Sequence, residues 1–368
     1  MSVNIGIIGL DNSGKTSLFR ALTHGIQASG RSNMATVPVP DERLQVLTDM
    51  CHPKRTVPTG IQFVDVGGIN RGAAESGGLG AQFLSNLQGV DALAVVVRFY
   101  SRPDLGMGPE PAAPFEDLEG ILLELGLSDL SRIERRLERT AKAARSGDQA
   151  AKREEEALRK IHERLDAGLP ARGVELAASD LEAIKDLGLL TLKPMIYVAN
   201  VAEDDLGPAL DQELPDPNGV RDTLNRLRDF AGERSAEVAI VSAATEAELG
   251  DLPEEDAREY LESLGVTETG MARFVKTAYD LLGLLTFLTA GEPEVRAWTV
   301  RQGAKAPEAA GSIHSDIERG FIRAEVTAWS DLVEAGSPEA AKRAGKTRLE
   351  GKDYVMHEGD VVYFRFNV

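Results

Sequence analysis

The sequence predicts an α/β protein built around a parallel sheet, with a helical insertion and a smaller α+β module at its C-terminal end. Three observations support this prediction. Short apolar runs alternate with helical patterns along most of the first 280 residues. A highly charged helical stretch interrupts this alternation, and strand-like patterns dominate from Leu285 onward. We therefore expect three parts with these borders: residues 1–126 together with 188–280, residues 127–187, and residues 281–368.

Composition narrows the class of protein. The chain has 368 residues and a formal net charge of −18, which argues against binding nucleic acid through an overall positive field. No apolar stretch approaches the roughly 20 residues that cross a bilayer, and the first residues lack the pattern of a signal peptide. The single cysteine, Cys51, excludes an internal disulfide framework. We expect a cytoplasmic monomer that does not bind membranes.

The first sixteen residues hold the most specific pattern in the chain. An apolar run from Val3 to Ile8 leads into GLDNSGKT at residues 9–16, which fits G-x-x-x-x-G-K-[ST]. The residues that follow have the pattern of an amphipathic helix. Strand, glycine-rich loop and helix in this order predict a nest of backbone N–H groups that binds a phosphate chain at a helix N-terminus.

The side chains of this loop have separate expected functions. Gly9 and Gly14 supply positions where a Cβ would clash. Lys15 is expected to reach the β- and γ-phosphates, and the Thr16 hydroxyl is expected to bind Mg²⁺. The pattern therefore predicts a site for a nucleoside triphosphate.

A second part of this site follows the predicted strand at residues 59–66. The strand ends in DVGG, and a D-x-x-G at this place predicts that Asp65 holds Mg²⁺ through water and that the Gly68 N–H meets the γ-phosphate. The next residue is Ile69, where Ras-type proteins carry the glutamine that orients the attacking water. Because isoleucine has no hydrogen-bonding group, hydrolysis needs another group, a bound cation or a partner, or else is slow.

Two loops have the composition of nucleotide-sensing switches. Residues 25–36 are rich in Gly, Ser and Asn, and Thr36 at their end is a candidate for a second Mg²⁺ hydroxyl. The alternative interpretation is an ordinary loop threonine. Glycines recur between Gly72 and Gly80, as expected for a second switch.

The charged helical stretch from 127 to about 167 has two narrow apolar stripes separated by Ser-Gly-Asp at 146–148. Narrow stripes with charged remaining faces predict an antiparallel hairpin of two helices. Between residues 132 and 145 six basic residues stand against two acidic ones: Arg132, Arg135, Arg136, Arg139, Lys142 and Arg145. This local positive face fits either a contact with nucleic acid or a solvated surface laced with ion pairs.

The nucleotide base is expected at two further strand ends. One predicted strand ends in the string Asn200–Glu203, where guanine-binding proteins carry N-K-x-D. Asn200 is expected near the purine, but the extra methylene of Glu203 moves its carboxylate out of register for guanine, and an unpaired buried acceptor costs about 1–3 kcal/mol. Adenine offers an N6 amino donor, so we hypothesise that ATP binds at least as well as GTP. A later strand ends in Ser242 and Ala243, a loop expected to close over the purine through backbone contacts.

The whole chain resembles the YchF branch of the Obg-related P-loop GTPases, also called Obg-like ATPases. The strings that carry the resemblance are GLDNSGKTSLF, VPVPDERL, FVDVGGI, GLGAQFL, NVAEDDL in place of N-K-x-D, and SAATEAEL. Near the C-terminus, GSIHSDIERGFIRAEV and EGKDYVMHEGDVVYFRFNV resemble the TGS domain of this family, an α+β module of the β-grasp type.

The resemblance implies a Ras-like domain with an inserted coiled-coil arm and a TGS domain. It also implies a cytoplasmic nucleotide hydrolase that accepts ATP, associates with ribosomes and offers a groove suited to RNA. By motif, the phosphate-binding residues are Asn12, Ser13, Gly14, Lys15, Thr16 and Ser17. Val201 belongs beside the base through its backbone, and we hypothesise that Asn12 helps to bind K⁺. The family's first switch is longer than the corresponding stretch here, so Thr36 is assigned from its position alone.

The expected reaction is in-line attack of water on the γ-phosphate of ATP, with Lys15, Asp65 and Gly68 as the catalytic residues. Two other functions stay open. One is a GTPase of the same family. The other is a module that binds RNA or the ribosome and uses a nucleotide only as a structural ligand, with negligible turnover, because Ile69 cannot orient water.

Overall fold

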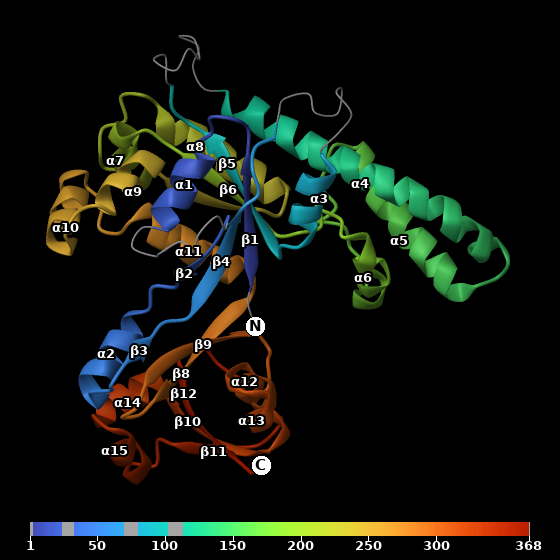
Figure 1. Cartoon of the computed structure of the whole chain (residues 1–368). Coiled ribbons are helices and arrows are strands. Elements are labelled where there is room, and N and C mark those ends of the chain that lie inside the picture. The colour runs from blue at the N-terminus through green and yellow to red at the C-terminus, as the bar shows by residue number, and fades with distance from the viewer. Residues whose placement is uncertain (1–2, 24–32, 70–79, 102–112, 368) are drawn as a thin grey trace. The chain divides into compact units, whose positions relative to one another are not determined.

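The structure, a computed structural model, describes residues 3–23, 33–69, 80–101 and 113–367 (Figure 1). All of the predicted second switch except Gly80, and most of the predicted first switch, lie outside these residues. The chain forms two compact units. The first comprises Asn4–Ala35 and Gln62–Thr277, and the second comprises Met1–Val3, Thr36–Ile61 and Ala278–Val368. None of the described helices has the length and hydropathy that crossing a bilayer requires.

A six-stranded sheet, with strand order β2-β4-β1-β5-β6-β7, forms the centre of the α/β fold. From β4 to β7 every neighbouring pair is parallel, as the sequence predicts. The strands are β1 (Asn4–Gly9), β2 (Met34–Pro38), β4 (Gly60–Asp65), β5 (Ala92–Arg98), β6 (Met195–Asn200) and β7 (Glu237–Val241). All six residues of β6 are buried, which is the pattern of a central strand covered on both faces.

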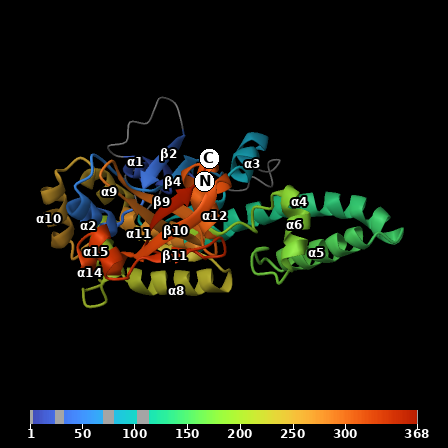
Figure 2. The ribbon, with the colours of Figure 1, turned by 90° about the horizontal axis from the view of Figure 1, so that it is seen from below.

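Helices cover both faces of this sheet (Figures 1 and 2). Those beside the sheet are α1 (Lys15–Leu22), α3 (Ala81–Gln88), α7 (Glu203–Leu210), α8 (Val220–Glu233), α9 (Ala243–Leu249), α10 (Glu254–Ser263) and α11 (Gly270–Leu281). Several follow a strand directly, so the carboxyl ends of the strands and the N-termini of these helices meet at one edge. In open α/β sheets this edge is where ligands bind.

Two long helices extend from this unit side by side (Figures 1 and 2). They are α4 (Pro114–Arg145) and α5 (Gln149–Asp166), and the Asp148 carboxylate caps α5 by accepting from the N–H groups of Ala150 and Ala151. Leucines and isoleucines of both helices share a small core of their own, which includes Ile133, Leu158 and Ile161. The two helices bury their apolar stripes against each other, and their remaining faces are charged.

Helix α4 crosses the border that we predicted at residue 127. It begins at Pro114, and Leu118, Ile121 and Leu125 in its first turns belong to the core of the sheet. The same helical spacing of apolar residues therefore continues from the sheet core into the paired helices. No sequence signal for a helix end separates the two environments, and the fold uses one continuous helix.

A buried carboxylate fastens α4 to the chain that enters β6. Asp129 has no exposed surface, and its oxygens accept from the Leu190 N–H at 2.9 Å, the Thr191 N–H at 2.7 Å and the Thr191 hydroxyl at 2.6 Å. Burial raises the pKa of Asp129, and the donors from Thr191 and Leu190 oppose that shift because they stabilise the ionised form. Short helix α6 (Ala178–Ile184) and the 3₁₀ turn Lys185–Leu187 lie in the same connection.

The second unit is a mixed sheet of order β11-β10-β12-β8-β9-β3. Its strands are β3 (Thr56–Val57), β8 (Leu284–Ala290), β9 (Val295–Arg301), β10 (Phe321–Ala328), β11 (Arg348–Glu350) and β12 (Asp360–Phe366). Its helices are α2 (Glu42–Cys51), α12 (Ala306–Ile313), α13 (Ser315–Arg319), α14 (Trp329–Ala335) and α15 (Pro338–Arg343). The α+β pattern expected for the C-terminal residues is therefore present.

Residues 36–61 belong to the same compact unit as the C-terminal sheet. The predicted borders had placed them in the nucleotide-binding part. Leu44 and Leu47 of α2 are buried against Leu288 and Val295 of the C-terminal sheet, and β3 pairs in parallel with β9. The apolar face of α2 has the ordinary helical pattern, which does not say which sheet it covers. The family's domain borders remain a prediction.

We predict that replacing Asp129 destabilises the first unit. In an Asp129→Ala protein three buried donors lose their acceptor, and each unpaired buried donor costs about 1–3 kcal/mol. Urea unfolding, followed by circular dichroism, should give a free energy of unfolding lower by at least about 2 kcal/mol. The exposed Glu134→Ala on the same helix is the control, and an equal loss in both variants would contradict the assignment.

Candidate nucleotide-binding site

The loop between β1 and α1 is a tight turn closed by its own backbone hydrogen bonds. The Ser13 N–H donates to the Leu10 carbonyl, and the Gly14 carbonyl accepts from Leu18 in the first turn of α1. Asn12 has a φ of 64° and Gly14 a φ of 93°, both in the left-handed region that glycine and asparagine tolerate best. The N-terminus of α1 therefore opens onto the loop, which is the geometry of an anion nest.

Both glycines of the pattern stand where a side chain has no room. A Cβ on Gly9 would lie 2.6 Å from the Val96 carbonyl oxygen. A Cβ on Gly14 would lie 2.1 Å from the amide nitrogen of Asn200. The steric constraint predicted from the sequence is present, but at Gly14 its source is a side chain almost two hundred positions away.

Lys15 is the buried cation of the loop. Its side chain is 7% exposed, and its ammonium donates to the Leu10 carbonyl at 2.7 Å. Burial lowers the pKa of Lys15, while Asp11 and Asp65 oppose the shift by electrostatic attraction. The next two residues of the predicted set, Thr16 and Ser17, are exposed in the first turn of α1.

Asp65 ends β4, which is the parallel neighbour of β1. The pairing of Ile7 with Asp65 brings this carboxylate to the same edge as the loop. Its Oδ1 accepts from the Gly67 N–H at 3.1 Å, and Gly68 lies beside the lysine, since a Cβ built there would be 3.3 Å from the Lys15 nitrogen. The structure thus brings together Lys15, Asp65 and Gly68, the three residues predicted to be catalytic.

The remaining predicted metal ligand is Thr36. It is an exposed residue of β2 that belongs to the second compact unit, where its methyl lies against Gly60. Its assignment as a Mg²⁺ ligand stays a prediction.

Asn200 connects the phosphate loop to the base end of the site. It is 3% exposed, its amide nitrogen donates to the Ser13 carbonyl at 3.0 Å, and its amide oxygen accepts from the Ala243 N–H at 2.9 Å. We expected Asn200 to contact the purine. In this structure its amide joins the loops that follow β1 and β7, and the contact with the purine stays a prediction.

A cavity of about 250 Å³ lies between these loops. It is lined by Gly14, Ser17, Tyr100, Ser101, Asn200, Val201, Ala202, Glu203, Ser242, Ala243 and Ala244. The lining contains every residue that we predicted at the base, and it extends to Gly14 and Ser17 of the phosphate loop. Tyr100, whose hydroxyl donates to the Asn12 carbonyl at 3.3 Å, was not predicted, because no motif marks it.

The Glu203 carboxylate has a hydrogen-bond partner that no sequence motif indicates. The Tyr260 hydroxyl of α10 donates to it, and this hydrogen bond raises the pKa of Tyr260 to about 12. The two residues are 57 positions apart. One carboxylate oxygen beside the candidate base pocket is therefore already engaged by the protein.

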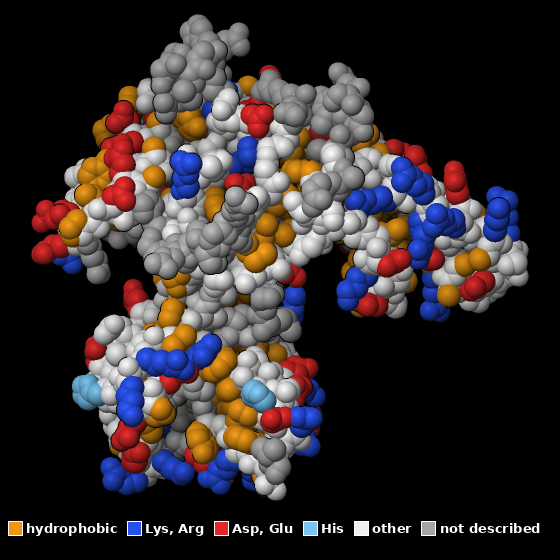
Figure 3. Space-filling model, in the orientation of Figure 1, with side chains coloured by type: hydrophobic (Ala, Val, Ile, Leu, Met, Phe, Trp, Pro, Cys, Tyr) orange, Lys and Arg blue, Asp and Glu red, His pale blue; other side chains and the backbone are white. Residues whose placement is uncertain are grey.

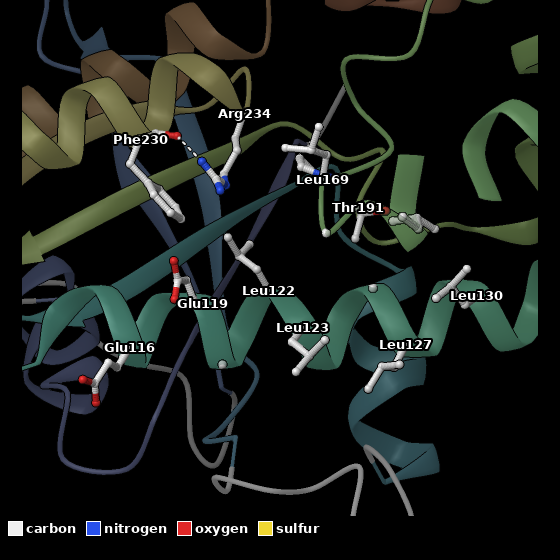
Figure 4. A pocket seen from close by; sticks show the side chains of 15 residues that line it. Glu116, Glu119, Leu122, Leu123, Leu127, Leu130, Leu169, Thr191, Phe230 and Arg234 are labelled. Atoms are coloured by element: carbon white, nitrogen blue, oxygen red, sulfur yellow. Dashed lines mark hydrogen bonds between the residues drawn. The ribbon is translucent and has the colours of Figure 1, made fainter. Parts of the chain in front are cut away.

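A second cavity of about 500 Å³ lies elsewhere on the first unit, along α4 (Figure 4). Leucines are the commonest residues of its walls, among them Leu122, Leu123 and Leu127, and Phe230 and Arg234 lie on the opposite side. None of the predicted site residues line it. Its apolar walls do not suit a phosphate chain.

Fold and site together define the class: a P-loop nucleotide-binding protein with the α/β fold of the GTPases. A family described as 50S ribosome-binding GTPase matches residues 4–132, and the C-terminal family of the YchF GTPases, described as a protein of unknown function (DUF933), matches residues 284–367.

The chain belongs to the YchF family. It is 45% identical to the "Ribosome-binding ATPase YchF" of Bacillus subtilis (strain 168) over 375 aligned residues, which cover all of both chains. The protein of the same name from Escherichia coli O157:H7 is 41% identical over the full length of both. The "Obg-like ATPase 1" of Oryza sativa subsp. japonica is 36% identical, over all of this chain and 92% of that protein. The solved Schizosaccharomyces pombe YchF GTPase superposes with a TM-score of 0.85 at 32% identity, covering 99% of this chain and 98% of that one.

We predict that Gly14→Ala weakens nucleotide binding. The substitution forces a left-handed backbone on alanine and drives a methyl into the Asn200 amide, so either the loop or Asn200 must move. The backbone cost alone is about 1–2 kcal/mol, which corresponds to a loss of affinity of about tenfold or more for ADP in calorimetry.

The matched control is Gly120→Ala in α4, where no atom lies within 4 Å of the added methyl. It should bind ADP as the unaltered protein does. Equal affinities in the two alanine variants would contradict the steric argument at Gly14.

Proposed function

We propose that this protein is a ribosome-associated nucleotide hydrolase that binds ATP with Mg²⁺ and hydrolyses its γ-phosphate. The observation that carries the proposal is the continuity of the site: one buried amide, that of Asn200, joins a phosphate-binding loop to a cavity large enough for the base end of a nucleotide. The names of the relatives, which specify ribosome binding and ATPase activity, support the same function.

In this proposal the residues at this edge of the sheet promote hydrolysis by positioning the phosphates and stabilising their negative charge. The backbone amides of Asn12 to Ser17 and the Lys15 ammonium would bind the phosphates, and the Gly68 N–H would contact the γ-phosphate as charge develops on it. Attack of water in line with the leaving oxygen then requires little covalent chemistry from the protein.

The Thr16 hydroxyl and the Asp65 carboxylate are the residues that would hold Mg²⁺. Among the described residues there is no cluster of three or more histidine, cysteine or acidic groups placed for a metal, but Mg²⁺ uses only one or two protein ligands together with phosphate oxygens and waters. A hydroxyl and a carboxylate beside a phosphate nest fit that requirement. When bound, Mg²⁺ neutralises charge on the β- and γ-phosphates.

Ile69 leaves the attacking water without a protein partner at the usual position. Its side chain is 1% exposed and packs in the apolar core, and its N–H donates to the Gly9 carbonyl. We propose that a K⁺ ion bound near Asn12, or the ribosome itself, supplies what is missing. The Thr36 hydroxyl, assigned from its position in the sequence, would be a further ligand of Mg²⁺.

The proposal predicts slow phosphate release from ATP by the protein alone and faster release with ribosomes. Lys15→Ala should lower both rates by at least about 100-fold, because the cation that stabilises the transferring charge is lost. A malachite-green assay measures the rates, and repeating it with K⁺ replaced by Na⁺ tests the cation, since equal rates would remove K⁺ from the proposal.

The same assay separates the two principal alternatives. Absence of phosphate release from either ATP or GTP, with and without ribosomes, would instead favour a binding module that uses nucleotide as a structural ligand. Release from GTP at a much higher kcat/KM than from ATP would favour a GTPase of this family.

Preference for ATP would follow from the engagement of Glu203. Guanine recognition needs a carboxylate free to accept from both N1–H and the 2-amino group, and the Glu203 carboxylate already accepts from the Tyr260 hydroxyl. Guanine would have to replace that hydrogen bond, whereas adenine makes no such demand.

We predict that Tyr260→Phe improves GTP binding more than ATP binding. The phenyl ring keeps the packing but frees the carboxylate, so the ratio of ATP affinity to GTP affinity should fall by roughly fivefold in equilibrium titration. The double change Val201→Lys with Glu203→Asp, which restores N-K-x-D, should lower the same ratio further. An unchanged ratio in both variants would contradict the specificity argument.

Ribosomal RNA would contact the exposed basic residues of α4. Two of the six basic residues have partners in the protein, since Arg132 donates to the Leu187 and Gly188 carbonyls and Arg136 pairs with Glu154. Arg135, Arg139, Lys142 and Arg145 are exposed, and Figure 3 shows basic side chains gathered over the paired helices. The overall charge of −18 makes such a local face necessary for any contact with RNA.

We predict that Arg135→Gln with Arg139→Gln weakens ribosome binding and lowers its dependence on salt. Each lost phosphate contact should reduce the slope of log affinity against log salt concentration by about 0.7–0.9. Co-sedimentation at several KCl concentrations measures the slope. Arg258→Gln with Lys276→Gln removes the same charge from α10 and α11, and an equal effect of both pairs would contradict a contact at α4.

For the rest of the chain we propose a TGS module of β-grasp type after residue 281 and a coiled-coil arm formed by α4 and α5. The exposed basic residues of this module, which include Lys342, Arg343 and Lys352, would extend the surface for RNA. We also propose that the protein is a monomer and that it meets ribosomes in the cytoplasm.

A further inference from the structure

The phosphate loop contains an acidic residue, Asp11, for which the proposed reaction has no use. Its side chain is exposed and faces the end of β4. A Cβ built on Gly68 would lie 2.2 Å from Oδ1 of Asp11 and 3.3 Å from the Lys15 nitrogen. An anionic oxygen, a buried cation and the backbone of Gly68 therefore converge on one small region.

That region is where the γ-phosphate is expected. Lys15 and Gly68 are the two groups that the proposed function assigns to it, one by charge and the other by its backbone N–H. In this structure the Asp11 carboxylate lies beside both residues. The attraction between Asp11 and Lys15 also opposes the fall in the lysine pKa that burial causes.

We propose that the Asp11 carboxylate is an internal substitute for the γ-phosphate, so that the loop binds nucleoside triphosphates less tightly, relative to diphosphates, than its sequence pattern implies. The inference rests on the proposed nucleotide binding and adds a residue that sets the preference between ATP and ADP. Two anions cannot share one cation at close range without repulsion, so the carboxylate must move away when a γ-phosphate arrives.

The diphosphate should be much less affected. The α- and β-phosphates are expected in the nest formed by the loop amides and the start of α1, whereas Gly68 marks the γ end of the site. Because the Asp11 side chain is exposed, it has room to rotate toward solvent. Asp11 therefore weakens triphosphate binding without preventing it.

The test compares the affinities of a non-hydrolysable ATP analogue with a β,γ-imido bridge and of ADP, both with Mg²⁺, by calorimetry. In Asp11→Asn, which keeps shape but removes charge, the analogue should bind about tenfold more tightly while the ADP affinity changes by less than about twofold. Asp11→Ser, a smaller neutral residue, should behave in the same way. Asp11→Glu keeps the charge and should retain the original ratio.

Asp204→Asn is the matched control, because it removes one exposed charge near the base end of the site and should leave the ratio unchanged. An unaltered ratio in both Asn and Ser variants at position 11, or an equal gain for ADP and the analogue, would overturn the role of Asp11 while leaving nucleotide binding intact. If the unaltered protein bound neither nucleotide, the proposed function itself would fall.

Discussion

The two hydrogen bonds of the Asn200 side chain are the interaction on which the candidate site depends. One joins the end of β6 to the phosphate loop after β1, and the other joins it to the loop after β7. The residue is almost fully buried, so a lost bond would leave a polar group unpaired away from water. The same amide also explains why Gly14 must be glycine. One side chain thus connects the loops of the site and restricts the residue at position 14 to glycine.

Parallel pairing makes this connection possible. In a parallel sheet the carboxyl ends of neighbouring strands lie at one edge, and the register pairs Ile7 with Asp65 and Asn200 with Val241. Residues far apart in the chain therefore reach the same edge without any long side chain. The continuous helix α4, fastened by Asp129, begins beside the same sheet and carries its basic surface outward from it.

Local charge, rather than the sum of charges, decides what this protein can bind. The net charge of −18 describes a surface that repels phosphates, yet the loop offers amides and a buried lysine, and α4 offers exposed arginines. Three acidic groups also lie at the site. Asp65 attracts Lys15 from the end of β4, Asp11 attracts it from within the loop, and the Glu203 carboxylate accepts a hydrogen bond from Tyr260.

Much of the fold was predictable from the sequence. The parallel strands, the phosphate loop and the strand-rich C-terminal part depend on local periodicity and on glycine placement, and the structure has all three. The start of α4 at Pro114 and the packing of α2 on the C-terminal sheet were not predicted. An apolar helix face indicates that it is buried, but its pattern does not identify the surface that buries it.

The sequence by itself determined the phosphate loop, because its conformation follows from a few consecutive residues whose φ angles and sterics are local properties. Only the tertiary structure decided the partners of Asn200, Glu203, Asp129 and Asp11. The chain separates Asn200 from its two partners by 187 and 43 positions, Glu203 from its partner by 57, and Asp129 from its partners by 61 and 62. The fold also places Asp11 of the loop beside Gly68, which follows another strand. Such pairs depend on strand register and helix docking, which arise when the whole core packs and leave no trace in the local pattern.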